Sequence, residues 1–282
     1  MKLDDVRASD NVEDQRASGG RGLRRGVALS GGTILVVGIL ALLTGQNPLQ
    51  LLSGLEQGTP ASSGAATQPV DPNDPAAMFV KRILATTEDV WRTLLPKMGG
   101  AYQDPKLVLY RDSVESACGF QQAAVGPFYC PGDSKAYFDL DFLDDLQKRL
   151  GAQGDFASAY VIAHEIGHHV QKLLGTSARA RAMGKSEGAE GGSVRLELQA
   201  DCYAGVWGHY AKTRGLLEAG DVEEALGAAA AIGDDTLQRR GRGRVTPETF
   251  SHGTSAQRAA WLRRGLDSGD PNTCDTFRAA RL

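Results

Sequence analysis

The chain has 282 residues, 41% of them hydrophobic and 23% charged, with a formal net charge of -3. This composition is ordinary for a globular protein, and no block of basic residues is large enough for nucleic-acid binding, which we exclude as a function. The four cysteines, Cys118, Cys130, Cys202 and Cys274, form no C-x-x-C pair, which argues against zinc ribbons and thioredoxin-like redox motifs.

An uncharged stretch near the N-terminus predicts a transmembrane anchor over residues 26–44. No charged residue occurs from Gly26 to Leu55, and the apolar core Val27–Leu43 lies at the lower end of the length that spans ~30 Å of hydrocarbon. A cleaved signal peptide is the alternative, but the sequence after Leu43, TGQNPLQ, contains no A-x-A-like cleavage site. We therefore favour an uncleaved single-pass anchor.

The charges around this stretch predict its orientation. Arg21, Arg24 and Arg25 precede it, and no Lys or Arg follows until Lys81. The positive-inside rule then places residues 1–25 in the cytoplasm as a tail and the rest of the chain outside. Residues 45–76 are rich in Gly, Pro, Ser, Thr and Ala, which is typical of a flexible linker. The folded, extracytoplasmic domain is thus predicted over residues 77–282.

Residue patterns in this domain predict an α+β fold, with a small sheet followed by a mostly helical C-terminal part. Apolar periodicity and helix-ending glycines or prolines place the elements. The predicted strands are Lys106–Tyr110 and Lys135–Leu140. The predicted helices are Met78–Leu95, Asp141–Leu150, Asp155–Leu174, Ser193–Thr213 and a helix to Ile232 that begins with a capping box of Asp221 and Glu224. Residues 176–192 are predicted to be an exposed loop.

The long helix contains an H-E-x-x-H motif formed by His164, Glu165 and His168. Residues at i and i+4 lie on one helix face, so the two histidines can bind one metal ion. A catalytic zinc ion takes three protein ligands and leaves a position for water, so a third donor has to come from elsewhere. We predict zinc as the cofactor.

Glu197 is the predicted third ligand, and Asp201 lies one helical turn after it. We expect Asp201 to accept a hydrogen bond from a ligand imidazole and so fix its tautomer. The metzincin alternative requires a third histidine after the motif, whereas this chain continues H-V-Q-K-L-L-G from His169. An H-E-x-x-H helix followed by an E-x-x-x-D helix favours a zincin-like arrangement with His, His and Glu ligands.

The sequence resembles the bacterial putative neutral zinc metallopeptidase family, whose domain accompanies a single N-terminal membrane span. The resemblance covers about Ala77–Phe277. It rests on SACG at Ser116–Gly119, GPFYCP at Gly126–Pro131, AYVIAHEIGHHVQ around the motif, ELQADCYAGVW at Glu197–Trp207, AIGDD at Ala231–Asp235 and SHGTSAQR at Ser251–Arg258. Ser251 and Ile166 depart from the residues common in the family, and neither is a predicted ligand. The resemblance implies a peptidase without naming its substrate.

The motif predicts hydrolysis of a peptide or protein substrate by a zinc-activated water. Glu165 is the predicted general base, which takes the proton of the water and passes it to the leaving amine. A non-catalytic, zinc-stabilised envelope scaffold is the alternative function. Glu165 argues against that alternative, because a structural zinc site is usually closed by four protein ligands and needs no acid beside them.

Three further histidines are considered for the site. His252 lies in S-H-G-T-S, a Gly-containing loop that can approach a metal site, and we predict that it donates a hydrogen bond to the tetrahedral oxyanion. His169 and His209 are predicted to pack or support rather than to bind the metal. Asp234 and Asp235 can bind a cation, but solvation or pairing with Arg239 is the favoured interpretation.

Two remaining patterns leave alternatives open. Cys118 with Cys130 and Cys202 with Cys274 are plausible disulfides in an oxidising compartment, although four cysteines allow three pairings. Tyr137 and Phe138 lie in the strand that precedes the motif helix. An edge strand there would pair with an extended substrate, but a core strand is favoured slightly.

Overall fold

A computed structural model describes residues 1–17, 67–122, 126–142, 146, 154–182 and 188–282. The predicted anchor over residues 26–44 and most of the predicted linker lie outside these residues. In the part of the chain that is described, no helix is both long enough and apolar enough to cross a membrane.

The centre of the N-terminal half is a four-stranded sheet with the order β1-β2-β6-β5. Its strands are β1 (Val12–Asp14), β2 (Lys106–Tyr110), β6 (Lys135–Asp139) and β5 (Phe128–Cys130). β1 and β6 pair with β2 in parallel, and β5 pairs with β6 in antiparallel. A separate hairpin of β3 (Ser113–Ser116) and β4 (Gly119–Gln122) follows β2.

The position of β6 decides between the two interpretations of Tyr137 and Phe138. β6 is an inner strand, and both side chains are buried. Tyr137 stacks on Phe128, with ring centroids 4.7 Å apart. The core interpretation is therefore confirmed, and β5, rather than β6, is the strand that ends the sheet on this side.

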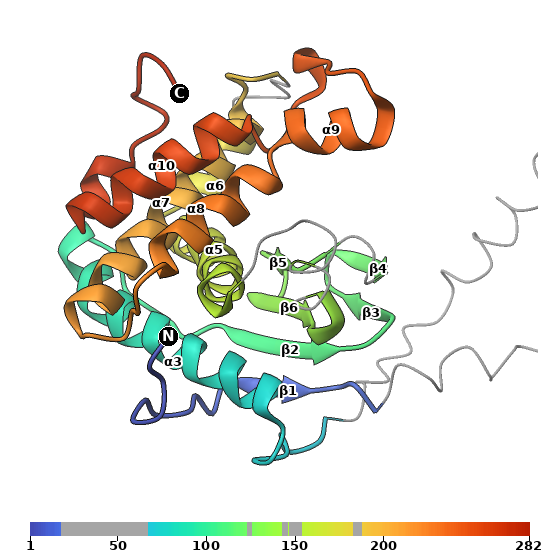
Figure 1. The fold of residues 1–282 in the computed structure, drawn as a ribbon, viewed down its shortest axis with the longest axis vertical. Helices are drawn as coiled ribbons and strands as arrows, with labels where there is room; N and C mark the ends of the chain where they lie inside the picture. Colours follow the sequence, from blue (N-terminus) through green and yellow to red (C-terminus); the bar gives the residue numbers. More distant parts are fainter. Residues whose placement is uncertain (18–66, 123–125, 143–145, 147–153, 183–187) are drawn as a thin grey trace, which may run out of the picture.

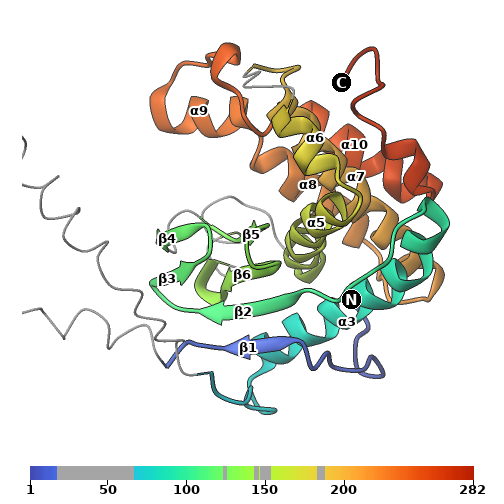
Figure 2. The ribbon, with the colours of Figure 1, turned by 180° about the vertical axis from the view of Figure 1, so that it is seen from behind.

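Helices form the other half of the molecule (Figures 1 and 2). They are α3 (Pro75–Leu94), α5 (Asp155–Leu173), α6 (Thr176–Ala182), α7 (Gly192–Thr213), α8 (Asp221–Ala231), α9 (Asp234–Arg242) and α10 (Ser255–Ser268). Short 3-10 helices cover Leu95–Met98, Pro247–Thr249 and Pro271–Cys274. α5 lies between the sheet and the group of α7, α8 and α10, with α7 packed against it, whereas α3 runs beside β1 and β2 (Figure 1). The predicted α+β class is confirmed.

Two local predictions are wrong. Residues 176–182 form α6 rather than part of a loop. The capping box predicted at Asp221 and Glu224 is absent, because α8 starts after Gly220 in a left-handed conformation. Asp221 instead accepts from the backbone N–H of Glu218, and Glu224 reaches across to that of Phe156. A local contact with the preceding turn thus uses the Asp221 carboxylate, and a tertiary contact with the start of α5 uses that of Glu224.

The N-terminal residues belong to the folded domain. β1 extends the sheet, and Leu3 and Val6 are buried in the main hydrophobic core. The sequence placed residues 1–25 in a separate tail and began the domain at residue 77, so the structure extends the domain to include residues 1–17. The VED sequence of β1 has no apolar alternation, which is why the strand escaped prediction.

Tight helix crossings hold the C-terminal half together. A Cβ built on Gly205 of α7 would lie 2.1 Å from the carbonyl oxygen of Leu262, and one on Gly265 of α10 would lie 2.0 Å from that of Cys202. Only glycines allow α7 and α10 to approach so closely. This crossing packs the second half of α10 against the middle of α7, and Arg258, earlier in α10, reaches Asp201 with its side chain.

Both plausible disulfides are present. Cys118 and Cys130 join the turn of the β3-β4 hairpin to β5, and Cys202 and Cys274 join α7 to the C-terminal 3-10 helix. Among the three pairings that the sequence allows, this is the one predicted from compartment and chain position. The second disulfide closes a long loop and secures the helix that carries Glu197.

Candidate metal centre

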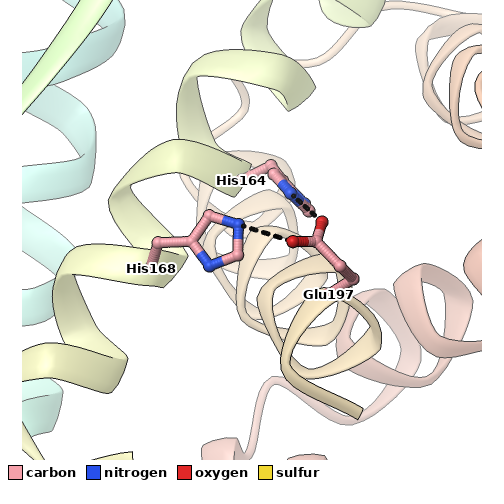
Figure 3. A group of neighbouring side chains, drawn as sticks. All are labelled: His164, His168 and Glu197. Carbon is pink, nitrogen blue, oxygen red and sulfur yellow. Dashed lines mark hydrogen bonds and ion pairs between the residues drawn. The ribbon is translucent and has the colours of Figure 1, made fainter. Parts of the chain in front are cut away.

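His164 and His168 point from the same face of α5 toward α7 (Figure 3). Their ring centroids are 4.8 Å apart and their planes nearly perpendicular, at 88°. The apolar residues before them bury this part of α5, so the imidazoles lie at the bottom of a cleft rather than on an open surface. The i, i+4 spacing thus produces the paired donors that it predicts.

Glu197 reaches the two histidines from α7. Its Oε2 lies 3.2 Å from His164 Nε2, and its Oε1 lies 3.5 Å from His168 Nε2 (Figure 3). The helices come this close because Gly167 faces α7, where an added Cβ would lie 3.0 Å from the carbonyl oxygen of Ala200. The motif glycine therefore sets the distance across which the third donor has to reach.

These three side chains fit a zinc ion. Each offers one donor atom, and the three atoms lie within 4.8 Å of one another. Two imidazole nitrogens and a carboxylate oxygen are a donor set that zinc accepts in catalytic sites, where water takes the fourth position. Burial alone would lower the pKa of His168, but the charge and hydrogen bond of Glu197, together with Glu165 and Gln171, raise it to about 9. The site thus favours a positive charge at this position.

Hydrogen bonds on the far side of each ring fix the tautomers. His164 Nδ1 lies 2.8 Å from Asp201 Oδ1, and His168 Nδ1 lies 2.9 Å from Gln171 Oε1. The amide of Gln171 is oriented by its Nε2, which donates to the carbonyl of Leu196 at 2.7 Å. With both Nδ1 atoms facing acceptors, both Nε2 lone pairs are directed at the Glu197 carboxylate and available to a metal.

Asp201 is fully buried and forms a larger network. Its carboxylate accepts from the Tyr160 hydroxyl at 2.6 Å and from Nε and Nη2 of Arg258, both at 2.9 Å. Burial opposes the negative charge, but Arg258 and His164 prevail and lower the pKa of Asp201 to about 2. The residue is therefore an ionised carboxylate that holds His164 in place.

Glu165 lines a cavity of about 640 Å³ together with both histidines and Glu197. Its side chain is buried, and no hydrogen bond or ion pair ties its carboxylate to another described residue. β5 and the residues before it form one wall of the cavity, while α6, α7 and α9 contribute to the other. Glu165 is thus free to exchange a proton with a molecule bound in the cavity.

His252 also lines this cavity, in the loop before α10. Its Nδ1 lies 3.2 Å from Asp234 Oδ1, and Asp234 Oδ2 accepts from the backbone N–H groups of Ser251, His252 and Gly253. The hydrogen bond to Asp234 raises the pKa of His252 above its usual value, and about half of the His252 side chain, 51%, is exposed. Asp234 therefore orients the ring instead of binding a cation.

The other candidates lie away from the three donors. His169 is buried, donates from Nε2 to the carbonyl of Gln103 and faces the Tyr129 hydroxyl with Nδ1. His209 Nδ1 faces the carbonyl of Leu266. Asp235 accepts from Ser255, with Arg239 at 3.8 Å. A second cluster of three acidic residues, Asp155, Asp221 and Glu224, could also offer metal donors. It lies next to the positively charged N-terminus, where the Met1 ammonium is 2.7 Å from Asp155.

Four supporting residues were assigned no such role from the sequence: Tyr160, Gln171, Asp234 and Arg258. Tyr160 and Gln171 lie one turn before and after the ligand histidines, so helix periodicity would have placed them nearby. Arg258 and Asp234 come from separate elements, and only the tertiary packing brings them to the site. Their signals in the sequence were the strings AIGDD, which contains Asp234, and SHGTSAQR, which contains both His252 and Arg258.

Comparison with known proteins agrees with this geometry. The model of the putative neutral zinc metallopeptidase family matches residues 1–277, which include the N-terminal strand. The chain is 51% identical over 287 residues to the uncharacterized protein YpfJ of Escherichia coli K12, covering 98% of this chain and 99% of that protein. It is 47% identical over 222 residues to the uncharacterized protein Mb2605 of Mycobacterium bovis, covering 73% and 74%.

No solved structure matches the chain. The family match covers nearly all of the sequence, and the relatives align over most or all of their length. The chain therefore belongs to the putative neutral zinc metallopeptidase family.

Proposed function

We propose that the protein is a zinc-dependent endopeptidase with a zincin-like site. The observation that carries this is the convergence of His164 Nε2, His168 Nε2 and a Glu197 oxygen within 4.8 Å, beside the Glu165 carboxylate, which forms no hydrogen bond or ion pair with another described residue. A three-donor site with an adjacent carboxylate supports catalysis more than a closed structural site does.

When bound, zinc supplies an activated water and polarises the scissile carbonyl. His164, His168 and Glu197 hold the ion, and Asp201 and Gln171 keep the two imidazoles in the tautomer that this requires. Glu165 accepts a proton in the cavity and returns it to the amine of the leaving peptide. No hydrogen bond joins its carboxylate to another residue that the structure describes, which suits a group that has to change protonation state in each cycle.

His252 stabilises the developing oxyanion in this proposal. It lies in the cavity wall, and its Nδ1 is held by Asp234, which leaves Nε2 as the ring nitrogen available to a substrate. Because Asp234 favours the imidazolium form, Nε2 carries a proton that it can donate. The Asp234 carboxylate thus orients the His252 imidazole through Nδ1, on the opposite side of the ring from Nε2.

Attachment to a membrane belongs to the same proposal. The uncharged stretch from Gly26 to Leu55 supports an anchor, and two disulfides are typical of proteins in oxidising, extracytoplasmic compartments. A peptide or protein substrate would then be met outside the cytoplasm.

The test compares the wild-type protein with Glu165→Gln, using a library of fluorescence-quenched peptides and zinc analysis of the same samples. We expect the variant to keep one zinc per chain and to lose turnover, because the carboxylate acts on the water rather than on the ion. Glu223→Gln is the matched control, since Glu223 is exposed on α8. Equal turnover in wild type and Glu165→Gln would refute the proposed mechanism.

A further inference from the structure

The N-terminal segment, residues 1–17, is bound to the rest of the domain along its whole length. β1 pairs with β2 over three residues, from Val12 opposite Leu107 to Asp14 opposite Leu109. The backbone N–H of Gln15 continues the pairing by donating to the carbonyl of Leu109 at 2.8 Å. Before the strand, Leu3 and Val6 contribute to the main hydrophobic core.

A buried carboxylate makes this segment a necessary part of the fold. The Glu88 side chain, on α3, is only 1% exposed. Its close partners all come from the N-terminal segment: Arg7 at 2.7 Å, Ser9 at 2.5 Å and Asn11 at 2.9 Å. The guanidinium of Arg92 is farther away, at 3.8 Å. The segment thus both covers the Glu88 carboxylate and supplies its close partners, and a buried charge whose partner is removed while it stays buried is strongly destabilising.

The described residues on either side of residues 18–66 lie next to each other. Gln68 forms a bridge to Asp14 and donates its backbone N–H to the Asp14 carbonyl at 2.8 Å. The guanidinium of Arg16 pairs with Asp14 and with Asp74, both at 2.6 Å. The two flanks of residues 18–66 are therefore joined by a strand bridge and an ion-pair cluster.

This contact constrains the topology of any membrane attachment. A single crossing between Arg16 and Gln68 would put the two flanks on opposite faces of a bilayer about 30 Å thick. Backbone hydrogen bonds of 2.8 Å cannot form across that distance. A cytoplasmic tail over residues 1–25 is thus incompatible with the domain lying outside, because its first 17 residues are part of that domain.

We propose that residues 1–17 and residues 67–282 lie on the same side of any membrane to which the chain attaches. The strand bridge of Asp14 with Gln68 and the ion pairs of Arg16 with Asp14 and Asp74 join the two flanks there. This inference stands apart from the peptidase proposal, because it uses no residue of the metal site.

The first test places one cysteine in each part of the full-length protein. Asp5 and Asp267 are exposed and far apart in sequence, so Asp5→Cys and Asp267→Cys report the two regions separately. Spheroplasts expressing each variant are treated with a membrane-impermeant maleimide before or after lysis. The parent protein, whose four cysteines form disulfides, gives the background. We expect the two variants to label at the same stage; labelling of one before lysis and of the other only after it would overturn the proposal.

A second test asks whether the N-terminal segment packs on the domain in the membrane-attached protein. Arg7→Ala should lower the melting temperature because Glu88 loses its closest cation, and Glu88→Gln should remove most of that penalty. Lys2→Ala is the control within the same segment, since the Lys2 side chain is exposed. Purely additive effects of Arg7→Ala and Glu88→Gln would show that the segment is not docked and would likewise overturn the proposal.

Discussion

Arg258 and Asp201 form a buried, two-point ion pair between α10 and α7. Nε and Nη2 of the arginine each lie 2.9 Å from a separate oxygen of the carboxylate. Since Asp201 also contacts His164, the pair connects the C-terminal helix with a metal ligand. A carboxylate with two cationic or donor neighbours keeps its charge while supporting the imidazole, so Arg258 is a positioning residue for the site.

Loss of Arg258 should therefore affect both stability and zinc binding. Arg258→Ala leaves the buried Asp201 charge without its ion-pair partner, with only Tyr160 and His164 among the described residues still hydrogen-bonded to it, and loss of a buried partner typically costs about 3–5 kcal/mol of the free energy of unfolding. Arg258→Lys restores the charge but not the two-point geometry, so its effect should be smaller. Thermal unfolding and zinc titration of both variants check this. Equal zinc affinity in wild type and Arg258→Ala would show that the pair serves stability alone.

Glu197→Ala should remove most of the bound zinc. The remaining histidines provide two donors, and a stable catalytic site needs three. Asp201→Asn should retain zinc with an affinity lower by about 10- to 100-fold, because it weakens the hold on His164 without removing a ligand. Zinc content after dialysis against a chelator separates the two cases. A full complement of zinc in Glu197→Ala would exclude Glu197 as a ligand.

His252→Ala should keep its fold and its zinc but lose turnover. Removal of one oxyanion donor typically lowers kcat by about 10²- to 10³-fold, with little change in KM. Steady-state kinetics and zinc content of the same preparation are the measurements. Normal turnover would assign the oxyanion role to another group, whereas loss of zinc would make His252 a ligand.

The pH dependence should reveal the pairing of His252 with Asp234. The hydrogen bond to Asp234 raises the pKa of His252 above 6.5, and the nearby charges of Glu197 and Arg258 act in opposite directions. The stabilising contact is thus complete below pH 6.5 and is lost as the pH rises through the higher folded-state pKa. Activity that needs the imidazolium should decline in the same range.

Asp234→Asn tests this assignment, because the substitution removes the charge that holds the proton on His252. In the variant, the fall of kcat at alkaline pH should begin at a lower pH than in the wild-type protein, while the zinc content stays unchanged. Asp267→Asn, at an exposed position of α10, is the matched control. An unshifted alkaline limb would mean that another group sets it.

The metal donors were more predictable than the residues that support them, because helix periodicity is local. The spacing of His164 and His168 places both on one face of α5 whatever surrounds them. Arg258 arrives through the crossing of α7 and α10, which depends on Gly205 and Gly265 and leaves no periodic signal. The sequence VED of β1 has no periodic signal either, because a short edge strand pairs through its backbone and needs no alternation of apolar side chains.

Gly167 offers the sharpest test of how the site distance is set. A methyl group there would lie 3.0 Å from the carbonyl oxygen and 3.1 Å from the Cα of Ala200, and backbone atoms of a packed helix cannot move aside locally. Gly167→Ala should therefore push α5 and α7 apart by a few tenths of an ångström and weaken zinc binding. Both histidines and Glu197 remain in the variant, so a change in affinity reports geometry alone.

Gly227→Ala is the matched control for this substitution. Gly227 lies within α8, and nothing lies within 4 Å of the added methyl. Its replacement should raise the free energy of unfolding by about 0.5–1 kcal/mol, because glycine is the poorer helix former, and should leave zinc affinity unchanged. Gly167→Ala gains the same helix propensity, so a weaker zinc site in a protein of near-normal stability isolates the effect of the crossing. Unchanged zinc affinity in Gly167→Ala would show that Glu197 adapts to the wider spacing and that the glycine does not set the site.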